Sequence, residues 1–183
     1  DTSFFKESER FDRHLDKLRR KGQGVDYVSV CSPNYLHDSH IRLALRNQCN
    51  VICEKPLVLI HEHLEALKSI EKETGKTINT ILQLRYHPTI IALKEDIKNT
   101  SKSSKGTLIL ENAKVNYNLS IQKEDLPWDE WKPFRSIKID DEELEFSTGF
   151  TELHNISYQE ILKGNGFTLE DVEPTIKLIE KIR

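Results

Sequence analysis

The stretch Val25-Asp-Tyr-Val-Ser-Val-Cys31 decides the fold. It is a β-branched run of strand length, and the turn residues Ser32-Pro33-Asn34 close it. A second run, Asn50-Val-Ile-Cys-Glu-Lys-Pro56, ends at its proline, which cannot donate to a sheet ladder. A third run, Thr77-Ile-Asn-Thr-Ile-Leu-Gln-Leu-Arg85, has the same character. We therefore predict three buried strands between Val25 and Arg85.

Apolar residues at helical spacing lie before and between these strands. The stripes are Phe11, Leu15 and Leu18, then Ile41, Ala44 and Leu45, then Ile60, Leu64 and Leu67. A further helix is predicted from Pro88 onward. Strands that alternate with helices form parallel sheets through right-handed crossovers. The first half of the chain is therefore predicted to be a doubly wound α/β domain.

The hydrophobic period changes after residues 99–106, which have the composition of a linker. From Ile109 to Ile121 the odd positions are apolar except for Glu111, which predicts one long strand of an antiparallel sheet. A hairpin of Ser136-Ile-Lys-Ile with Glu143-Leu-Glu-Phe and two helices, around 153–162 and 172–182, complete the pattern. The sequence thus predicts an α/β domain over residues 1–99 and an α+β domain over residues 100–183.

Composition excludes several classes of protein and several classes of partner. Of the 183 residues, 37% are hydrophobic and 31% are charged, which excludes a disordered chain and a coiled coil. Acidic residues outnumber basic ones by 30 to 27, so we expect neither nucleic acid nor a membrane as partner. No apolar run has the length of a membrane span, and the N-terminus lacks the pattern of a signal peptide. The odd number of cysteines favours reduced thiols and a cytoplasmic location.

Unusual polar residues follow each predicted strand. Ligands of an open parallel sheet bind at the carboxyl ends of its strands, so these residues are candidates for a site. No metal motif accompanies them, because Cys49 and Cys53 lack a second pair of ligands and His61 and His63 do not share a helix face. The three segments are Ser32-Pro33-Asn34-Tyr35-Leu36-His37, Glu54-Lys55-Pro56 and Gln83-Leu84-Arg85-Tyr86-His87-Pro88.

In this order on successive strands, the three segments resemble the glucose–fructose oxidoreductase, inositol dehydrogenase and MocA (Gfo/Idh/MocA) family of NAD(P)-dependent sugar oxidoreductases. Further segments resemble the branch that oxidises UDP-N-acetylglucosaminuronic acid at C3 in lipopolysaccharide O-antigen synthesis. They are Phe11-Asp-Arg-His-Leu, Cys31-Ser-Pro-Asn-Tyr-Leu-His37, Leu82-Gln-Leu-Arg85 and Phe150-Thr-Glu-Leu-His154.

The resemblance implies a fold, a cofactor and partners. The fold is an incomplete Rossmann-like dinucleotide-binding domain followed by an α+β domain for substrate binding and oligomerisation. The cofactor is NAD, and the substrate is a UDP-activated uronic acid. 2-Oxoglutarate is implied as the ligand that reoxidises bound NADH, and a homo-oligomer is expected.

The resemblance also assigns roles to residues. Lys55 is the catalytic residue that holds or accepts the hydroxyl proton, and it contacts the substrate. Pro56 restricts Lys55 to extended backbone, so Glu54 and Lys55 are expected on opposite faces. Gln83 and Arg85 lie two positions apart on the third predicted strand, hence on one face. Arg85 and Tyr86 belong to the substrate side, and an arginine there suits a carboxylate or pyrophosphate. The cofactor-binding residues are Ser32, Pro33, Asn34, Leu36, His37, Glu54 and Gln83.

Structural interpretations of the same residues stay open. Glu54 and Lys55 can form a surface pair, Asn34 can make a turn that leads into a helix at His37, and Arg85 can be a solvated residue at a strand end.

Two motifs of the family pattern are missing from the sequence. It holds no G-x-G-x-x-G, and Gly22-Gln-Gly24 precedes a strand instead of following one. None of the seven histidines lies in the glycine- and aspartate-containing helix that carries the family's second active-site histidine. We therefore expect an N-truncated, internally deleted family member. The alternative function is a catalytically inactive remnant that acts only as a binding or oligomerisation module.

Overall fold

The computed structural model describes residues 2–88, 90–91, 108–110, 113–115, 134–139, 142–148 and 152–182. The chain forms two compact units. The first comprises Asp1–Leu82 and Ser157–Arg183, and the second comprises Gln83–Ile156. The C-terminal helix belongs to the first unit, whereas the sequence pattern assigns it to the second domain. The predicted boundary between residues 99 and 100 lies outside the described residues.

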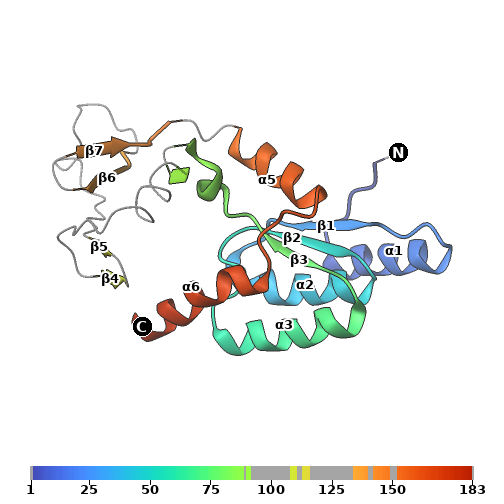
Figure 1. Cartoon of the computed structure of the whole chain (residues 1–183). Coiled ribbons are helices and arrows are strands. Elements are labelled where there is room, and N and C mark those ends of the chain that lie inside the picture. Colours follow the sequence, from blue (N-terminus) through green and yellow to red (C-terminus); the bar gives the residue numbers. More distant parts are fainter. Residues whose placement is uncertain are drawn as a thin grey trace. The chain divides into compact units, whose positions relative to one another are not determined.

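A parallel sheet forms the centre of the first unit (Figure 1), in the strand order β1-β2-β3. Val51 lies opposite Val28 of β1 on one side and opposite Ile78 of β3 on the other. The predicted Rossmann-like parallel architecture is confirmed. In chain order the elements of this unit are α1 (Ser8–Arg20), β1 (Tyr27–Val30), η1 (Asn34–Leu36), α2 (His37–Arg46), β2 (Asn50–Cys53), α3 (His61–Thr74), β3 (Ile78–Thr80) and α6 (Leu169–Ile182).

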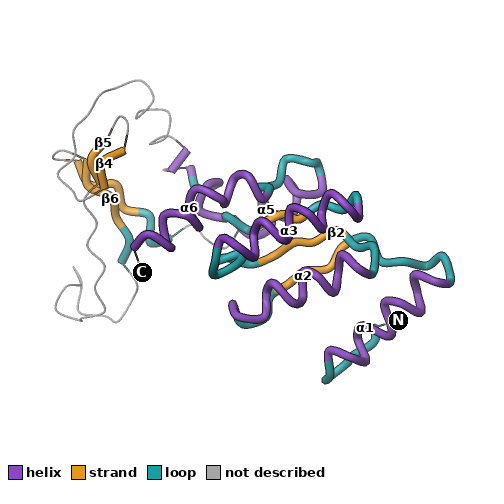
Figure 2. Tube along the Cα trace, turned by 90° about the horizontal axis from the view of Figure 1, so that it is seen from below, coloured by secondary structure: helices purple, strands orange, loops and turns teal. Residues whose placement is uncertain are grey.

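Helices cover both faces of this sheet. On one face α2, α3 and α6 pack over the strands, and Figure 2 shows α6 beside α3. Each fully buried leucine or isoleucine on this face stabilises the fold by about 1.5–3 kcal/mol. On the other face, Tyr158 and Ile161 of α5 (Leu153–Leu162) pack against Ile52 and Ile81. The fully buried side chains of the first face include Ile41, Leu45, Val51, Leu64, Leu67 and Leu169.

Strand β3 makes hydrogen bonds beyond its pairing with β2. The Ile78 N–H donates to Glu71 Oε1 of α3 at 2.7 Å, and the Thr80 N–H donates to Phe167 O at 2.9 Å. Burial raises the pKa of Glu71. Phe167 lies between α5 and α6 and forms an antiparallel bridge with Thr80. The segment that leads into α6 is therefore fixed to the sheet by its backbone.

The predicted third strand is too long. β3 ends at Thr80, and Gln83–Tyr86 forms the 3₁₀ helix η2. The cause is the length of β2, which ends at Cys53. The Ile81 N–H donates to Cys53 O at 2.8 Å, and the N–H of the next residue, Glu54, donates to Val30 of β1 and not to β3. The inference that Gln83 and Arg85 share one face of a strand is therefore wrong.

The predicted long strand from Ile109 to Ile121 is also wrong. β4 (Leu108–Leu110) and β5 (Ala113–Val115) pair antiparallel with each other, and Leu110 pairs with Ala113 across two residues. Alternation of apolar and polar residues alone does not distinguish one long strand from a tight hairpin. Residues 116–121 lie outside the described residues.

The remaining elements of the second half are close to the prediction, although α6 begins at Leu169, three residues before the predicted start at Val172. β6 (Ser136–Ile139) and β7 (Glu142–Glu145) form the predicted hairpin, and α5 spans the predicted Leu153–Leu162. Thr168 donates through its N–H and its hydroxyl to Asp171 Oδ2, at 2.9 and 3.2 Å, which caps the start of α6. In the described residues, no helix combines the length and the apolar character that crossing a membrane requires.

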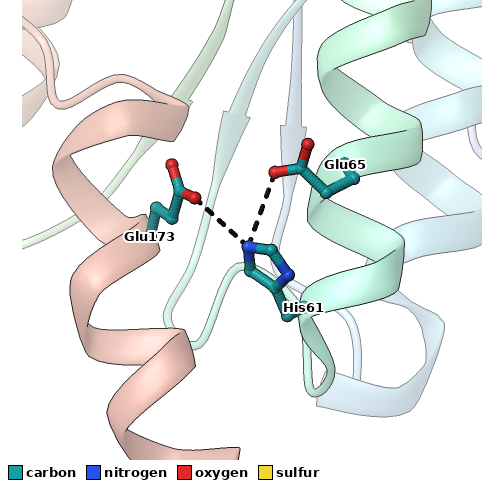
Figure 3. A group of neighbouring side chains, drawn as sticks. All are labelled: His61, Glu65 and Glu173. Atoms are coloured by element: carbon teal, nitrogen blue, oxygen red, sulfur yellow. Dashed lines mark hydrogen bonds and ion pairs between the residues drawn. The ribbon is translucent and has the colours of Figure 1, made fainter.

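Ion pairs join α6 to α3 around the Glu173 carboxylate. Lys68 Nζ lies 2.6 Å from Glu173 Oε2, and Lys177 Nζ lies 2.5 Å from Glu173 Oε1. His61 Nε2 lies 3.2 Å from Glu173 Oε1 and 3.5 Å from Glu65 Oε1 (Figure 3). Hydrogen bonds from Lys177, Lys68 and His61 lower the pKa of Glu173 to about 2. The network links two helices that are far apart in the sequence.

This network predicts a dependence of stability on pH. The pKa of Glu173 is about 2 in the folded protein and 4.5 in its ordinary state. Its ionised form therefore stabilises the fold above pH 4.5, and this contribution is lost as the pH falls toward 2. Urea unfolding midpoints should fall more between pH 5 and pH 2.5 for the wild type than for Glu173→Gln. Glu62→Gln, on helix α3 but outside the network, should behave as the wild type. Equal pH slopes for all three proteins would contradict the prediction.

A second prediction concerns Gly166, which lies between α5 and the bridge to β3. A Cβ atom at this position would lie 2.8 Å from both Asn79 Cγ and Ile161 Cγ1. Gly166→Ala should therefore lower the free energy of unfolding by about 1–3 kcal/mol, measured by urea unfolding. Gly24→Ala is the control, because its Cβ would only reach Arg19 Cα at 3.9 Å. Equal free energies of unfolding for the two variants would contradict the prediction and show that the Asn79 and Ile161 side chains move aside without cost.

Candidate active site

The segments that follow β1 and β2 form the candidate site of the first unit. The Glu54 N–H donates to Val30 O at 3.0 Å, which extends the pairing of the two strands by one residue. Lys55 comes next and is exposed, and its peptide bond to Pro56 is cis. The carboxyl ends of parallel strands lie at one edge of a sheet, so the turn with Lys55 adjoins the loop that begins at Ser32.

His37 links these two segments. Its side chain is completely buried at the start of α2. Nδ1 lies 2.8 Å from Pro56 O, and Nε2 lies 2.8 Å from Ser32 O. The nearby His40 Nδ1 lies 2.9 Å from Ser32 Oγ. Sequence reasoning placed His37 near the cofactor but did not foresee that its ring bridges two backbone carbonyl groups.

The remaining predicted residues of this unit differ in exposure. The residues that follow β1 include η1, which Pro33 precedes and which leads directly into α2. This agrees with the structural interpretation of a turn followed by a helix, and the same turn presents polar groups at the sheet edge. Pro33 and Asn34 are exposed, whereas Ser32, Leu36 and Glu54 are partly buried.

The predicted residues Gln83, Arg85 and Tyr86 belong to the second unit. They lie on η2, where Arg85 is exposed and the other two are partly buried. Among the described residues, the buried Gln83 Oε1 has no hydrogen-bond partner. The next residue, His87, is buried, and its Nε2 lies 3.2 Å from Thr148 O. His87 was quoted in the sequence motif without a role, and its contact with a distant segment could not be read from spacing.

A cavity of about 490 Å³ lies beside the β1 exit in the first unit. Polar groups from Ser29, Ser32 and His40 contribute to its wall. Ser29 Oγ also lies 2.6 Å from the Tyr158 hydroxyl of α5. Sequence reasoning missed this cavity, because neither the helical stripe nor the family segment that contains Phe11 places it beside β1. Apolar side chains of the wall are Phe4, Phe5, Phe11, Val30 and Leu43.

The cysteines offer no nucleophile that the structure activates. Cys31, Cys49 and Cys53 are free thiols, as the sequence predicts, and Cys49 and Cys53 are buried. Burial raises the pKa of both buried thiols, which disfavours the reactive thiolate. Their role is packing in the core.

The group of His61, Glu65 and Glu173 has ligand atoms within 4.8 Å of one another, the arrangement of a metal site. Sequence reasoning missed it, because it compared His61 only with His63 and could not place Glu173 on the neighbouring helix. Lys68 Nζ bridges the two carboxylates, at 2.9 Å from Glu65 Oε1 and 2.6 Å from Glu173 Oε2. An ammonium group thus already neutralises the carboxylates a metal would need, so we assign the group to ion pairing.

Comparison with known proteins supports the resemblance seen in the sequence. The family described as "Oxidoreductase family, NAD-binding Rossmann fold" (Gfo/Idh/MocA) matches residues 3–81. D-Glucoside 3-dehydrogenase of Escherichia coli (strain K12) is 34% identical over 74 residues, which are 40% of this chain and 21% of that protein. The chain thus spans about a fifth of the length of this curated relative.

Solved structures match nearly the whole chain. The WlbA (WbpB) dehydrogenase from Thermus thermophilus, in complex with NAD and UDP-GlcNAcA, has a TM-score of 0.89 and is 32% identical. The match covers 98% of this chain and 78% of that one. The same dehydrogenase in complex with NAD and alpha-ketoglutarate has a TM-score of 0.87 and is 33% identical, with 96% and 78% covered. With its parallel sheet and these matches, this chain belongs to the Gfo/Idh/MocA oxidoreductase family, whose members have an NAD-binding Rossmann fold.

Proposed function

We propose that the protein is an NAD-dependent sugar-nucleotide dehydrogenase. In this proposal it oxidises the C3 hydroxyl of a UDP-activated N-acetylated uronic acid and yields the 3-keto sugar and NADH. The observation that carries the proposal is the match over 98% of the chain to a dehydrogenase solved with NAD and UDP-GlcNAcA. The relative from Escherichia coli is also named for dehydrogenation at position 3 of a sugar. We place the reaction in cytoplasmic synthesis of lipopolysaccharide O-antigen sugars.

Lys55 carries the proton chemistry in this mechanism. The bound NAD supplies the acceptor for the hydride that leaves C3. Lys55 Nζ takes the proton of the C3 hydroxyl, and its exposed position at the tip of the turn leaves it accessible to a substrate. Glu54 precedes it and stays aligned with β1 through its N–H bond to Val30 O. The cofactor-binding role of Glu54 follows from the family resemblance.

The chain's own polar groups fit a nicotinamide cofactor. Gln83 Oε1 is a buried acceptor without a partner among the described residues, and the carboxamide N–H of a nicotinamide is a matching donor. Ser32 presents a hydroxyl beside the cavity at the β1 exit. Pro33, Asn34 and Leu36 complete the cofactor side of the first unit in this proposal, and His37, which the resemblance also assigns to that side, supports their loop through its contact with Ser32 O at 2.8 Å.

The second unit supplies the substrate contacts of the proposal. Arg85 is exposed on η2, and its planar guanidinium suits the carboxylate or pyrophosphate of a UDP-uronic acid. Tyr86 follows it on the same short helix. We assign 2-oxoglutarate as the second substrate, because its keto group can accept the hydride of NADH, with a proton, and regenerate NAD. The complex of the related dehydrogenase with alpha-ketoglutarate supports this assignment. We also propose that the protein is a homo-oligomer.

The third prediction tests Lys55. In Lys55→Ala, the rate of NADH formation with UDP-GlcNAcA should fall by about two to four decades, because a positioned proton acceptor is lost. The dissociation constant for NAD, measured by calorimetry, should not change. Lys72→Ala, an exposed lysine of α3, is the matched control and should keep the wild-type rate. If the wild type binds NAD and forms NADH, and Lys55→Ala forms NADH at the same rate, Lys55 has no role in the mechanism.

The same measurements test the alternative function. The sequence has no glycine-rich phosphate turn, the observation that favours a non-catalytic binding or oligomerisation module. If the wild-type chain neither binds NAD nor forms NADH, and light scattering shows a defined oligomer, that module is the function.

The fourth prediction tests Arg85. Arg85→Lys keeps the charge but loses the paired donors, so KM for the UDP-sugar should rise by about 10- to 100-fold. The dissociation constant for NAD should stay at the wild-type value. Arg46→Lys, an exposed residue at the end of α2, controls for the exchange itself. Equal losses for sugar and NAD would mean that Arg85 has a structural role.

A further inference from the structure

His37 begins α2 and lies between two backbone carbonyl groups. Its ring is completely buried, so water does not compete for either nitrogen. Pro56 O lies 2.8 Å from Nδ1, and Ser32 O lies 2.8 Å from Nε2. The two carbonyl groups belong to segments that leave different strands, β1 and β2. A single rigid ring therefore sets the separation between these segments.

We propose that His37 is a positioning residue that fastens the Lys55–Pro56 turn to the Ser32 loop. The catalytic importance of this contact rests on the function proposed for Lys55, whereas the contact itself does not. The Pro56 carbonyl belongs to the residue directly after Lys55, so the bond at Nδ1 limits how far the Lys55 backbone can move. His37 thus acts through Lys55 and does not itself need to touch substrate.

The chemistry of the ring explains why a histidine serves here. Its two nitrogens point away from opposite sides of a planar ring, so one side chain reaches acceptors on two segments. A neutral imidazole carries one N–H, which donates to one carbonyl group, while an imidazolium donates to both. For Lys55 the decisive contact is the one at Nδ1, because it faces Pro56 O, which accepts a hydrogen bond from any ring form that carries its N–H at Nδ1. An unbonded turn would let Lys55 sample positions away from the reacting hydroxyl, and small misplacements of this kind reduce rates by about 100-fold.

Three substitutions separate the two contacts. His37→Asn places an amide N–H2 near the position of Nδ1 and keeps the donor to Pro56 O. His37→Gln reaches the position of Nε2 and keeps the donor to Ser32 O. His37→Phe fills the same space without any donor. His63→Asn on α3, which the candidate site does not include, is the control for the exchange of a histidine.

The first readout is amide hydrogen exchange of the peptide over residues 54–58, measured by mass spectrometry on the full chain without ligands. Exchange should be about tenfold faster in His37→Phe and His37→Gln, the factor for loss of one hydrogen bond, and near wild type in His37→Asn. Peptides from α3 should not change, which shows that the variants remain folded. Unchanged exchange in all variants, or protection by glutamine but not by asparagine, would overturn the proposal.

The second readout is the kinetics with NAD and UDP-GlcNAcA. In His37→Phe and His37→Gln, kcat should fall by about 10- to 100-fold while KM for NAD stays constant, and His37→Asn should restore kcat. A loss of NAD affinity without a loss of kcat would make His37 a cofactor ligand and overturn its positioning role. If the wild type shows no turnover, the proposed function fails. The exchange experiment alone still decides whether His37 fastens the Lys55–Pro56 turn to the Ser32 loop.

Discussion

Strand β2 sets the geometry on which the candidate site depends. Within the described sheet, β2 alone has a hydrogen-bonded neighbour on each side, and its residues Val51, Ile52 and Cys53 are buried. The Glu54 N–H bond to Val30 O carries this alignment one residue past the end of the strand. The turn with Lys55 therefore starts from a backbone that is held in place, and His37 holds the turn again at Pro56. The paired strands and the buried His37 ring together fix the backbone on both sides of the exposed Lys55.

The first unit is closed by a segment from the far end of the sequence. Leu169, Val172 and Ile176 of α6 join the same core as Leu64 and Leu67 of α3. Buried apolar area attaches the helix, because ion pairs between partly exposed side chains contribute less than a buried leucine. The ion pairs around Glu173 instead fix how α6 lies against α3 and make that attachment sensitive to acid. The core of the first unit thus includes residues that lie far from its strands in the sequence.

Sequence patterns correctly predicted those helices and strands that depend mainly on neighbouring residues. The β-branched run ending at Cys31 and the helical stripe through Leu64 predicted elements in the right places, and the strand-end motifs led to the family. The predictions that failed concern strands whose length depends on the segment with which they pair. The predicted strand to Arg85 stopped at Thr80 because β2 ends at Cys53, and the run from Ile109 concealed a hairpin.

The candidate site was also predicted unevenly. Motif spacing brought Ser32, His37 and Lys55 to one edge of the sheet, which the structure shows. It could not show that His37 faces two carbonyl groups, because that contact needs the path of the chain after Pro56. The grouping of His61 with Glu173 needed the packing of α6 and was invisible for the same reason. The roles of Gln83, Arg85 and Tyr86 stay predictions.

Hydrogen bonds on the outer side of β3 occupy the backbone groups that a further strand would need at that edge of the sheet. The N–H groups of Ile78 and Thr80, which do not face β2, are taken by Glu71 and Phe167. An incoming strand would have to displace a partly buried carboxylate and a backbone bridge, so this edge is protected against association. In the described sheet β1 pairs with β2 alone. A strand that paired with β1 would lie directly beside the loop that begins at Ser32.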